Sequence, residues 1–188
     1  MNVAVVGSGP AADAAAAAVE DAGGAVVRGG VDALAGADLG VVTGLAGDDG
    51  FRAANAAALE GATPWLAVEG GGLGGHTVAG VEAAVSGFGP STACFACLAT
   101  RVAAGGTATG GEPSVDPPTA RLAGARAGLA AATLLSGGES PVLGGVVEIP
   151  HARRHLLPVP GCDSCADGRD RALAVAAGDR ELDAALAA

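Results

Sequence analysis

Short apolar runs alternate with alanine-rich stretches along the first half of this chain. Four runs rich in Val and Leu predict buried strands, at residues 2–6, 25–28, 38–43 and 64–69. Two alanine-rich stretches between them predict helices, at residues 11–22 and 50–60, because Ala has the highest helix propensity. This β-α-β alternation predicts an α/β fold, with an open, mostly parallel sheet and flanking helices.

The second half of the chain has a less regular pattern. Residues 76–89 predict two short strands, in which Val81 and Val85 point inward. Further along, the pattern predicts a helix, a loop, a long helix, a pair of strands and a final helix, at residues 94–104, 105–116, 117–135, 142–149 with 154–159, and 169–188. The long helix begins at a proline, which is typical of a first helical turn.

The charge balance narrows the classes of partner. The net charge is −10, and all ten basic residues are Arg because Lys is absent. Binding to nucleic acid or to an anionic membrane surface needs a positive face, so we expect neither. An acidic chain rich in Ala and Gly and without Lys resembles the proteins of salt-loving archaea, with a high-GC coding bias as the alternative.

The sequence shows no targeting or membrane segment. No uninterrupted apolar run reaches the roughly 18 residues that a membrane-spanning helix needs. The first residues have no basic segment of the kind that begins a secretion signal, and they run directly into a glycine turn. We therefore expect a cytoplasmic protein.

Four cysteines, the only ones in the chain, form two Cys-x-x-Cys pairs, Cys94/Cys97 and Cys162/Cys165. Each pair can present two thiolates from one tight turn, so together they can supply the four ligands of a closed tetrahedral zinc site. The pairs are far apart in the sequence, which favours a structural metal that joins distant segments. Two disulfides, which need an oxidising compartment, and a redox-active dithiol are the alternatives. A catalytic zinc needs an open coordination position, and four cysteine ligands leave none. We therefore assign no catalytic residue.

A glycine turn, Gly7-x-Gly9-x-x-Ala12, lies between the first predicted strand and the first predicted helix. Such a turn allows a phosphate to approach a helix N-terminus, so these three residues are the candidate nucleotide-binding positions. However, Pro10 removes one backbone N–H donor, and the second strand ends in Arg28 and not in an acid that would hold a ribose. Arg28 could instead contact the 2′-phosphate of NADP. The alternative is a turn that shapes the fold without binding a ligand.

The order of these features resembles the ThiF/MoeB group, which are relatives of ubiquitin-activating enzymes. Three segments carry the resemblance over nearly the whole chain, at residues 89–98 (GPSTACFACL), 118–137 and 155–165 (HLLPVPGCDSC). The first and third are similar to the two cysteine knuckles of that family, and the second is similar to its long helix. The resemblance implies a Rossmann-like domain with structural zinc held by Cys94, Cys97, Cys162 and Cys165.

Within that group, the chain is most similar to the ThiF-like domains that accompany YcaO cyclodehydratases in making azole- and azoline-modified peptides. In those systems the YcaO protein uses ATP to activate a backbone amide, while the ThiF-like protein binds the leader of the precursor peptide and docks on YcaO. The resemblance thus implies a YcaO-type protein, a precursor peptide, or both as partners. Since such domains can be fused to the N-terminus of YcaO, we expect a stand-alone protein or that part of a fusion.

Departures from the family argue against independent activity. Adenylating members use Arg and Lys around the phosphates and an acid for the ribose, and this chain has no Lys. One similarity remains: Arg52 and Asn55, on the helix after the third strand, resemble a basic residue and an Asn of that family's nucleotide site. The winged-helix module that captures leader peptides in many relatives is not expected here, which makes partner docking the expected role.

We therefore expect a catalytically degenerate zinc domain that helps a YcaO-type cyclodehydratase to present its peptide. An ATP-dependent adenylyltransferase and an NADP-binding oxidoreductase are the alternatives, and ATP as a cofactor and a homodimer are left open. We expect a single ThiF-like domain over residues 1–188, made of a Rossmann-like core, a zinc-clipped helix with a strand pair, and a C-terminal helix, at residues 1–90, 91–168 and 169–188. Other polar residues with conceivable chemistry are expected to be surface groups: His76, His151, His155, Asp38, Asp48 and Asp49.

Overall fold

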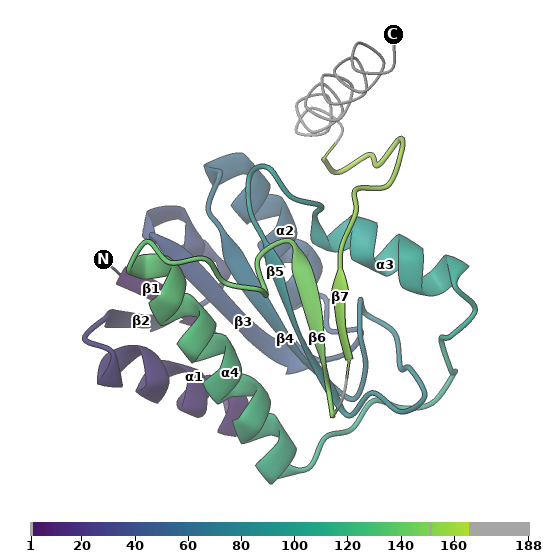
Figure 1. The fold of residues 1–188 in the computed structure, drawn as a ribbon, viewed down its shortest axis with the longest axis horizontal. Coiled ribbons are helices and arrows are strands. Elements are labelled where there is room, and N and C mark those ends of the chain that lie inside the picture. The colour runs from purple at the N-terminus through teal and green to yellow at the C-terminus, as the bar shows by residue number, and fades with distance from the viewer. Residues whose placement is uncertain (1, 151, 166–188) are drawn as a thin grey trace, which may run out of the picture.

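The chain folds into three layers around one seven-stranded sheet (Figure 1). The computed structural model describes residues 2–150 and 152–165. The strands are β1 (Asn2–Val6), β2 (Ala25–Gly29), β3 (Leu39–Leu45), β4 (Trp65–Gly70), β5 (Ala83–Phe88), β6 (Gly145–Ile149) and β7 (Ala152–His155). The helices are α1 (Pro10–Asp21), the 3₁₀ helix η1 (Val31–Gly36), α2 (Gly50–Gly61), α3 (Phe95–Ala104) and α4 (Pro117–Leu135). The α/β fold class predicted from the sequence is confirmed.

The sheet has a parallel half and an antiparallel half, in the order β2-β1-β3-β4-β5-β6-β7. The first four strands pair in parallel, and α1, η1 and α2 supply the crossovers between them. Each of β5, β6 and β7 is antiparallel to its preceding neighbour, so β6 returns to the direction of β1–β4. Five of the seven strands therefore run the same way.

Two sequence predictions in the second half need correction. Residues 76–89 contain one strand, β5, and not two, because residues 76–82 make only isolated bridges and turn at Gly80, where φ is 77°. In the predicted strand pair, β7 begins and ends earlier than expected, and residues 156–165 form the loop that carries the second cysteine pair. The predicted C-terminal helix, residues 169–188, lies outside the described residues.

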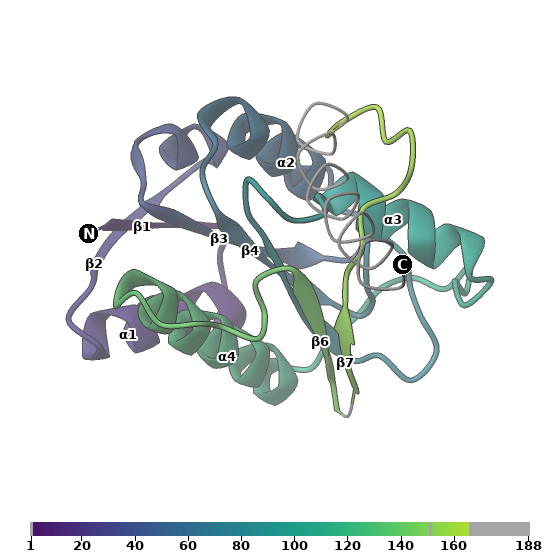
Figure 2. The same ribbon diagram turned by 45° about the horizontal axis from the view of Figure 1, so that its top comes forward.

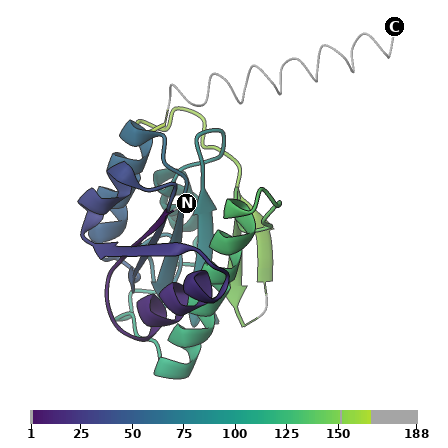
Figure 3. The same ribbon diagram turned by 90° about the vertical axis from the view of Figure 1, so that its left-hand side faces the viewer.

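The two faces of the sheet are covered by different helix pairs. Figure 2 shows α2 and α3 on one face and α1 and α4 on the other, and Figure 3 shows the layers from the side. The α2/α3 face contains all four aromatic residues of the chain, Phe51, Trp65, Phe88 and Phe95. Their rings are in contact, with centroids 4.8 Å apart for Trp65 and Phe88 and 5.5 Å apart for Phe51 and Phe95. The scarce large side chains thus gather beside the first cysteine pair.

The opposite face is built mainly from Ala and Val, and its two helices touch through glycines. A methyl group on Gly124 of α4 would collide with the carbonyl oxygen of Ala11 in α1. One on Gly128 would lie 2.5 Å from the carbonyl oxygen of Ala15 and 2.7 Å from Cβ of Ala18. The glycines therefore bring the two helix backbones together. Within the described part of the chain, no helix is long and apolar enough to cross a bilayer.

Candidate functional site

The four cysteines, distant in sequence, form one buried cluster between α3 and the loop that follows β7. Cys94 and Cys97 lie at the start of α3, and Cys162 and Cys165 lie in the loop. Their four sulfur atoms all lie within 4.8 Å of one another. Among the described residues, this is the single group of three or more Cys, His, Asp or Glu side chains placed so that it could hold a metal ion.

The distances between sulfurs suit tetrahedral coordination. Cys94 Sγ lies 3.8 Å from both Cys97 Sγ and Cys162 Sγ, and Cys97 Sγ lies 3.6 Å from Cys165 Sγ. A tetrahedron with metal–sulfur bonds of about 2.3 Å has edges of about 3.8 Å. These separations are well beyond the roughly 2.05 Å of a disulfide, so the four thiols are free. The cluster has the size and the soft donors of a four-sulfur metal site.

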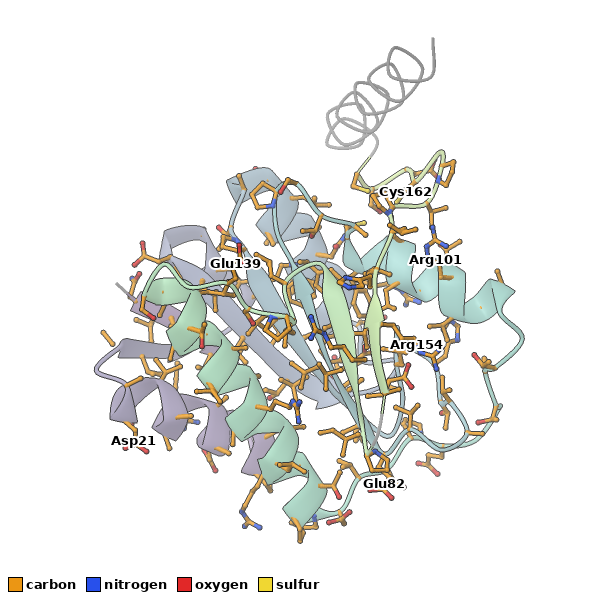
Figure 4. The ribbon with its side chains drawn as sticks, viewed as in Figure 1. Asp21, Glu82, Arg101, Glu139, Arg154 and Cys162 are labelled. Atoms are coloured by element: carbon orange, nitrogen blue, oxygen red, sulfur yellow. The ribbon has the colours of Figure 1, made fainter. Side chains whose placement is uncertain are left out.

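Backbone and side-chain hydrogen bonds hold the two cysteine pairs in place. The carbonyl oxygen of the Asn55 side chain, on α2, accepts a hydrogen bond of 2.9 Å from the backbone N–H of Phe95. Arg101 donates from Nε to the carbonyl of Leu157 at 2.7 Å and from its guanidinium Nη2 to the carbonyl of Pro158 at 2.9 Å. Figure 4 shows Arg101 on α3 below the loop that carries Cys162. The first pair is therefore anchored to α2, and the loop that leads to the second pair is anchored to α3.

Burial and hydrogen bonds shift the pKa values of cysteine thiols in the cluster. Burial raises the pKa of Cys94 to about 11, and burial also raises the pKa of Cys165. Burial opposes ionisation of Cys162 too, but backbone N–H groups of Ser164 and Cys165 lower its pKa. The N–H of Val159 donates a hydrogen bond to Cys97 Sγ, 3.3 Å away. A bound cation would replace the protons on the remaining thiols.

The glycine turn has the geometry of a tight strand-to-helix connection. Gly7 has a φ of 106°, and a methyl group there would collide with the backbone and side chain of Thr43. Gly9 has a φ of 85° and open space around its Cα, whereas Ala12 is fully buried against the sheet. Packing explains Gly7 and Ala12, whereas a methyl group on Gly9 would meet open space. The assignment of Gly7, Gly9 and Ala12 to nucleotide binding stays a prediction.

The two basic residues considered for nucleotide binding, Arg28 and Arg52, both pair with carboxylates. The guanidinium of Arg28, at the end of β2, lies 2.9 Å from a carboxylate oxygen of Asp13 on α1. Arg52 pairs with Asp49 at 3.1 Å, with both side chains mostly exposed. Asn55, which the family resemblance places near a nucleotide site, is buried and accepts a hydrogen bond from the backbone of Phe95, between the two cysteines of the first pair. The sequence alone did not indicate this role for Asn55.

The other candidate residues are scattered over the surface. His76 is half-buried in the loop after β4, and His155 is exposed on β7, while His151 lies outside the described residues. Asp48 accepts a hydrogen bond from the N–H of Gly50, and Asp38 accepts one from Asn2. All three described acidic candidates, Asp38, Asp48 and Asp49, are exposed.

The buried carboxyl group of Glu69 was missed by sequence analysis. Glu69, at the end of β4, is 0% exposed. Its two oxygens accept hydrogen bonds from the N–H groups of Gly74 and Gly75, at 2.8 and 2.6 Å. Burial raises the pKa of Glu69 to about 7, although these hydrogen bonds oppose the rise. The available signal was a single acidic residue at the end of an apolar strand, followed directly by a glycine-rich loop.

Comparison with known proteins gives similarity at the level of structure. No family model and no curated protein match the sequence. A heterocyclase solved in complex with substrate and cofactor matches with a TM-score of 0.60 and 18% identity. The match covers 88% of this chain and 25% of the heterocyclase chain. E. coli MccB with AMPCPP and MccA matches with a TM-score of 0.63 and 12% identity, over 88% of this chain and 66% of the MccB chain. E. coli MccB with ATP matches similarly, with a TM-score of 0.59.

The chain spans about a quarter of the heterocyclase and just under two thirds of MccB. At this level of identity the similarity concerns the fold. The chain therefore has the fold of MccB and of one part of the heterocyclase, which confirms at that level the resemblance to the ThiF/MoeB group predicted from the cysteine framework.

Proposed function

We propose that this chain is a zinc-stabilised, catalytically degenerate ThiF-like domain that docks on a YcaO-type cyclodehydratase and helps to present its peptide substrate. The observation that carries the proposal is the match to the heterocyclase, in which nearly all of this chain corresponds to a quarter of a larger protein. That proportion supports a domain that works beside a separate catalytic part. In this proposal residues 1–188 act as one domain, in the cytoplasm.

The metal in this proposal is zinc, held by Cys94, Cys97, Cys162 and Cys165. Sulfur-to-sulfur distances of 3.6–3.8 Å fit its bond length, and four thiolates are its usual structural ligand set. One Zn²⁺ ion carries two positive charges and the four thiolates carry four negative charges, so the site has an excess of negative charge. The N–H of Val159 near Cys97 partly offsets this excess. Zinc so bound would stabilise the fold and would not act on a substrate.

The charged residues support a degenerate nucleotide site. A triphosphate needs several positive charges, and the chain has no Lys. Arg28 already pairs with Asp13, and Arg52 pairs with Asp49. β2 ends at Gly29, where an acidic residue would be needed to hold a ribose. The pairing of Arg28 also weighs against the NADP-binding alternative.

A second candidate is an ATP-dependent adenylyltransferase of the ThiF/MoeB type. It is favoured by the similarity to MccB, which has been solved with ATP and with AMPCPP and MccA. Those structures share 12% identity with this chain, so ATP is a candidate ligand for this chain and no more than that.

The decisive experiment measures metal content, ATP binding and partner-dependent activity on one purified sample in high salt. We expect one zinc per chain, no heat of ATP binding by calorimetry at millimolar nucleotide, and faster peptide cyclodehydration when the chain is added to a YcaO-type enzyme. ATP–pyrophosphate exchange by the chain alone would establish the adenylyltransferase instead. Unchanged YcaO kinetics together with no complex in sedimentation would overturn the docking role, and the same sedimentation run reports whether the chain is a homodimer.

A further inference from the structure

β7 forms one edge of the sheet, where its inner side pairs with β6 and its outer side pairs with no described strand. The N–H of Leu156 donates to the carbonyl oxygen of Gly144 at 2.9 Å. Hydrogen-bonded pairs recur at every second residue of an antiparallel ladder, so Arg154 directs its backbone N–H and C=O toward β6. The backbone groups of Arg153 and His155 therefore point outward, and this row of open groups can pair with another strand.

A hollow of about 590 Å³ lies on the α3 side of β6 and β7. Its walls include Arg154, His155 and Leu156 at the edge of the sheet, and residues 105–109, which follow α3. The other wall residues are mostly apolar, among them Leu73, Val78, Leu98 and Val102. A strand that lies along β7 could therefore bury an apolar side chain here.

The outer side of β7 is basic although the chain as a whole is acidic. Arg153 and Arg154 lie on β7 and Arg101 lies on α3, and all three residues are exposed. Figure 4 shows Arg101 and Arg154 at the side of the molecule where β7 lies. Glu148 pairs with Arg154 at 2.6 Å, and it is the single acidic residue among the described residues that line the hollow. This edge therefore has an excess of positive charge, which suits a negatively charged partner.

We propose that the outer edge of β7 binds an acidic, extended peptide segment, which adds to the sheet as a further strand. The backbone of the segment would exchange hydrogen bonds with Arg153 and His155. Its successive side chains would alternate between the two faces of the sheet. Those on the α3 face would enter the hollow, and acidic ones on the opposite face would meet Arg153, whose register partner Val147 packs on the α1/α4 side. The inference rests on the proposed function for the role of the peptide, because it gives peptide presentation a site.

A second copy of this chain is a poor occupant of the same edge. Two β7 strands side by side would bring Arg153 and Arg154 of both copies together, and like charges on neighbouring strands destabilise the pair. Each chain also has a net charge of −10, so whole copies repel each other. A short acidic peptide at this edge meets the arginines at close range, where they outweigh the more distant and more screened negative charges.

The first test measures peptide binding by fluorescence anisotropy with the full-length, metal-loaded chain alone. The probe is a short labelled synthetic peptide in which Glu alternates with Leu, and the control peptide has Lys in place of Glu. We expect the Glu peptide to bind at least about tenfold more tightly than the Lys peptide, with an affinity that falls as salt is added. Equal affinities for the two peptides, or no binding of the Glu peptide at low salt, would overturn the proposal.

Two substitutions at one position separate strand pairing from charge. Arg153→Gln removes the charge and keeps the outward N–H, whereas Arg153→Pro also removes that N–H without removing a bond to β6. We expect Arg153→Pro to bind the Glu peptide roughly fivefold more weakly than Arg153→Gln does, because one further hydrogen bond is lost. Arg126→Gln, exposed on α4, is the matched control and should leave the affinity unchanged. Equal affinities of Arg153→Pro and Arg153→Gln would mean that charge alone holds the peptide, which contradicts strand addition.

Amide hydrogen exchange measured by NMR tests the geometry directly. The peptide should slow exchange of the Arg153 and His155 amides and leave that of Arg154, which already faces β6, unchanged. Exchange that slows with rising protein concentration in the absence of peptide would identify a second copy as the occupant and overturn the proposal. No YcaO-type enzyme is present in these measurements. Intact peptide binding without any effect on YcaO would therefore overturn the docking role alone, and the reverse result would overturn this site alone.

Discussion

Asn55 and Phe95 are joined by a buried hydrogen bond of 2.9 Å between the side chain of one and the backbone N–H of the other. Phe95 is the first residue of α3 and follows Cys94 directly. The N–H groups of a first helical turn have no partner within the helix, so this bond satisfies one of them from α2. It therefore links the middle of α2 to the backbone that orients the first two sulfurs.

Replacing Asn55 by Ala should weaken metal retention without changing any ligand. The Phe95 N–H would lose its partner in a buried site, which costs roughly 1–3 kcal/mol. Loss of a supporting hydrogen bond around a metal site typically weakens metal affinity by about 10–100-fold. The measurement is the rate of zinc transfer to a chromogenic chelator, together with the melting temperature.

Arg52→Ala is the control for Asn55→Ala, because Arg52 lies on the same helix but is exposed and pairs with the exposed Asp49. It should leave both zinc transfer and melting nearly unchanged, within about 0.5 kcal/mol. If Asn55→Ala released zinc no faster than Arg52→Ala, the hydrogen bond would have no part in holding the site.

Cys94→Ser should remove the metal and destabilise the fold. The bound metal contributes its binding free energy to folding only if all four ligands close around it. We expect the metal-to-chain ratio to fall well below one and the melting temperature to drop steeply, both measured on samples purified in parallel. Ala96→Ser, between the two cysteines of the same pair, should keep its metal. Full metal content and unchanged melting of Cys94→Ser would rule out a structural metal.

Glu69 should make the protein less stable as the pH rises. Its pKa is raised from 4.5 to about 7 in the folded state, so the folded protein holds a proton that the unfolded chain releases between these values. The contribution is fully present below pH 4.5 and is lost as the pH rises through 7, with a slope of at most about 1.4 kcal/mol per pH unit. Urea unfolding at several pH values gives this slope.

Glu69→Gln provides the reference for that measurement, because an amide does not titrate. The difference in unfolding free energy between the two proteins isolates Glu69 from the general charge repulsion of this acidic chain. A difference that stays constant between pH 4.5 and pH 8 would mean that the Glu69 carboxyl group has an ordinary pKa.

Gly124→Ala should destabilise the protein even though Ala favours helices by about 1 kcal/mol over Gly. The added methyl group would collide with the carbonyl oxygen of Ala11, which belongs to a backbone that cannot move without shifting α1. Thermal melting is the measurement, and Leu122→Ala, exposed on the same helix, is the control with little expected change. A melting temperature above that of the parent chain would show that the two helices have room to separate.

The regular parts of the fold could be predicted from the sequence because each depends on a local pattern. The parallel strands β1 to β4 and the helices α1, α2 and α4 follow from apolar runs, alanine stretches and a starting proline. The spacing within each cysteine pair predicts a turn with two thiols, and the structure brings all four sulfurs together. The identity of the metal stays a prediction.

The remaining features depend on contacts between distant residues. The partner of Arg28 is Asp13, which belongs to another element and cannot be identified from spacing. Asn55 serves the first cysteine pair because α2 happens to lie against α3, and Glu69 is buried because the loop after β4 folds back over it. Gly124 and Gly128 did carry a local signal, a glycine at every fourth position, which indicates a close helix contact.

The contact between α1 and α4, here called the seam, has a further consequence for the thermodynamics of this protein. Its buried members are nearly all Ala or Gly, including Ala12, Ala15, Ala123, Ala127 and Gly128. These side chains have no rotamers to lose on folding, so ordering the seam carries almost no side-chain entropy penalty. A small apolar area therefore suffices to hold the two helices together, which explains how a chain with 2% aromatic residues can form a stable layer on that face.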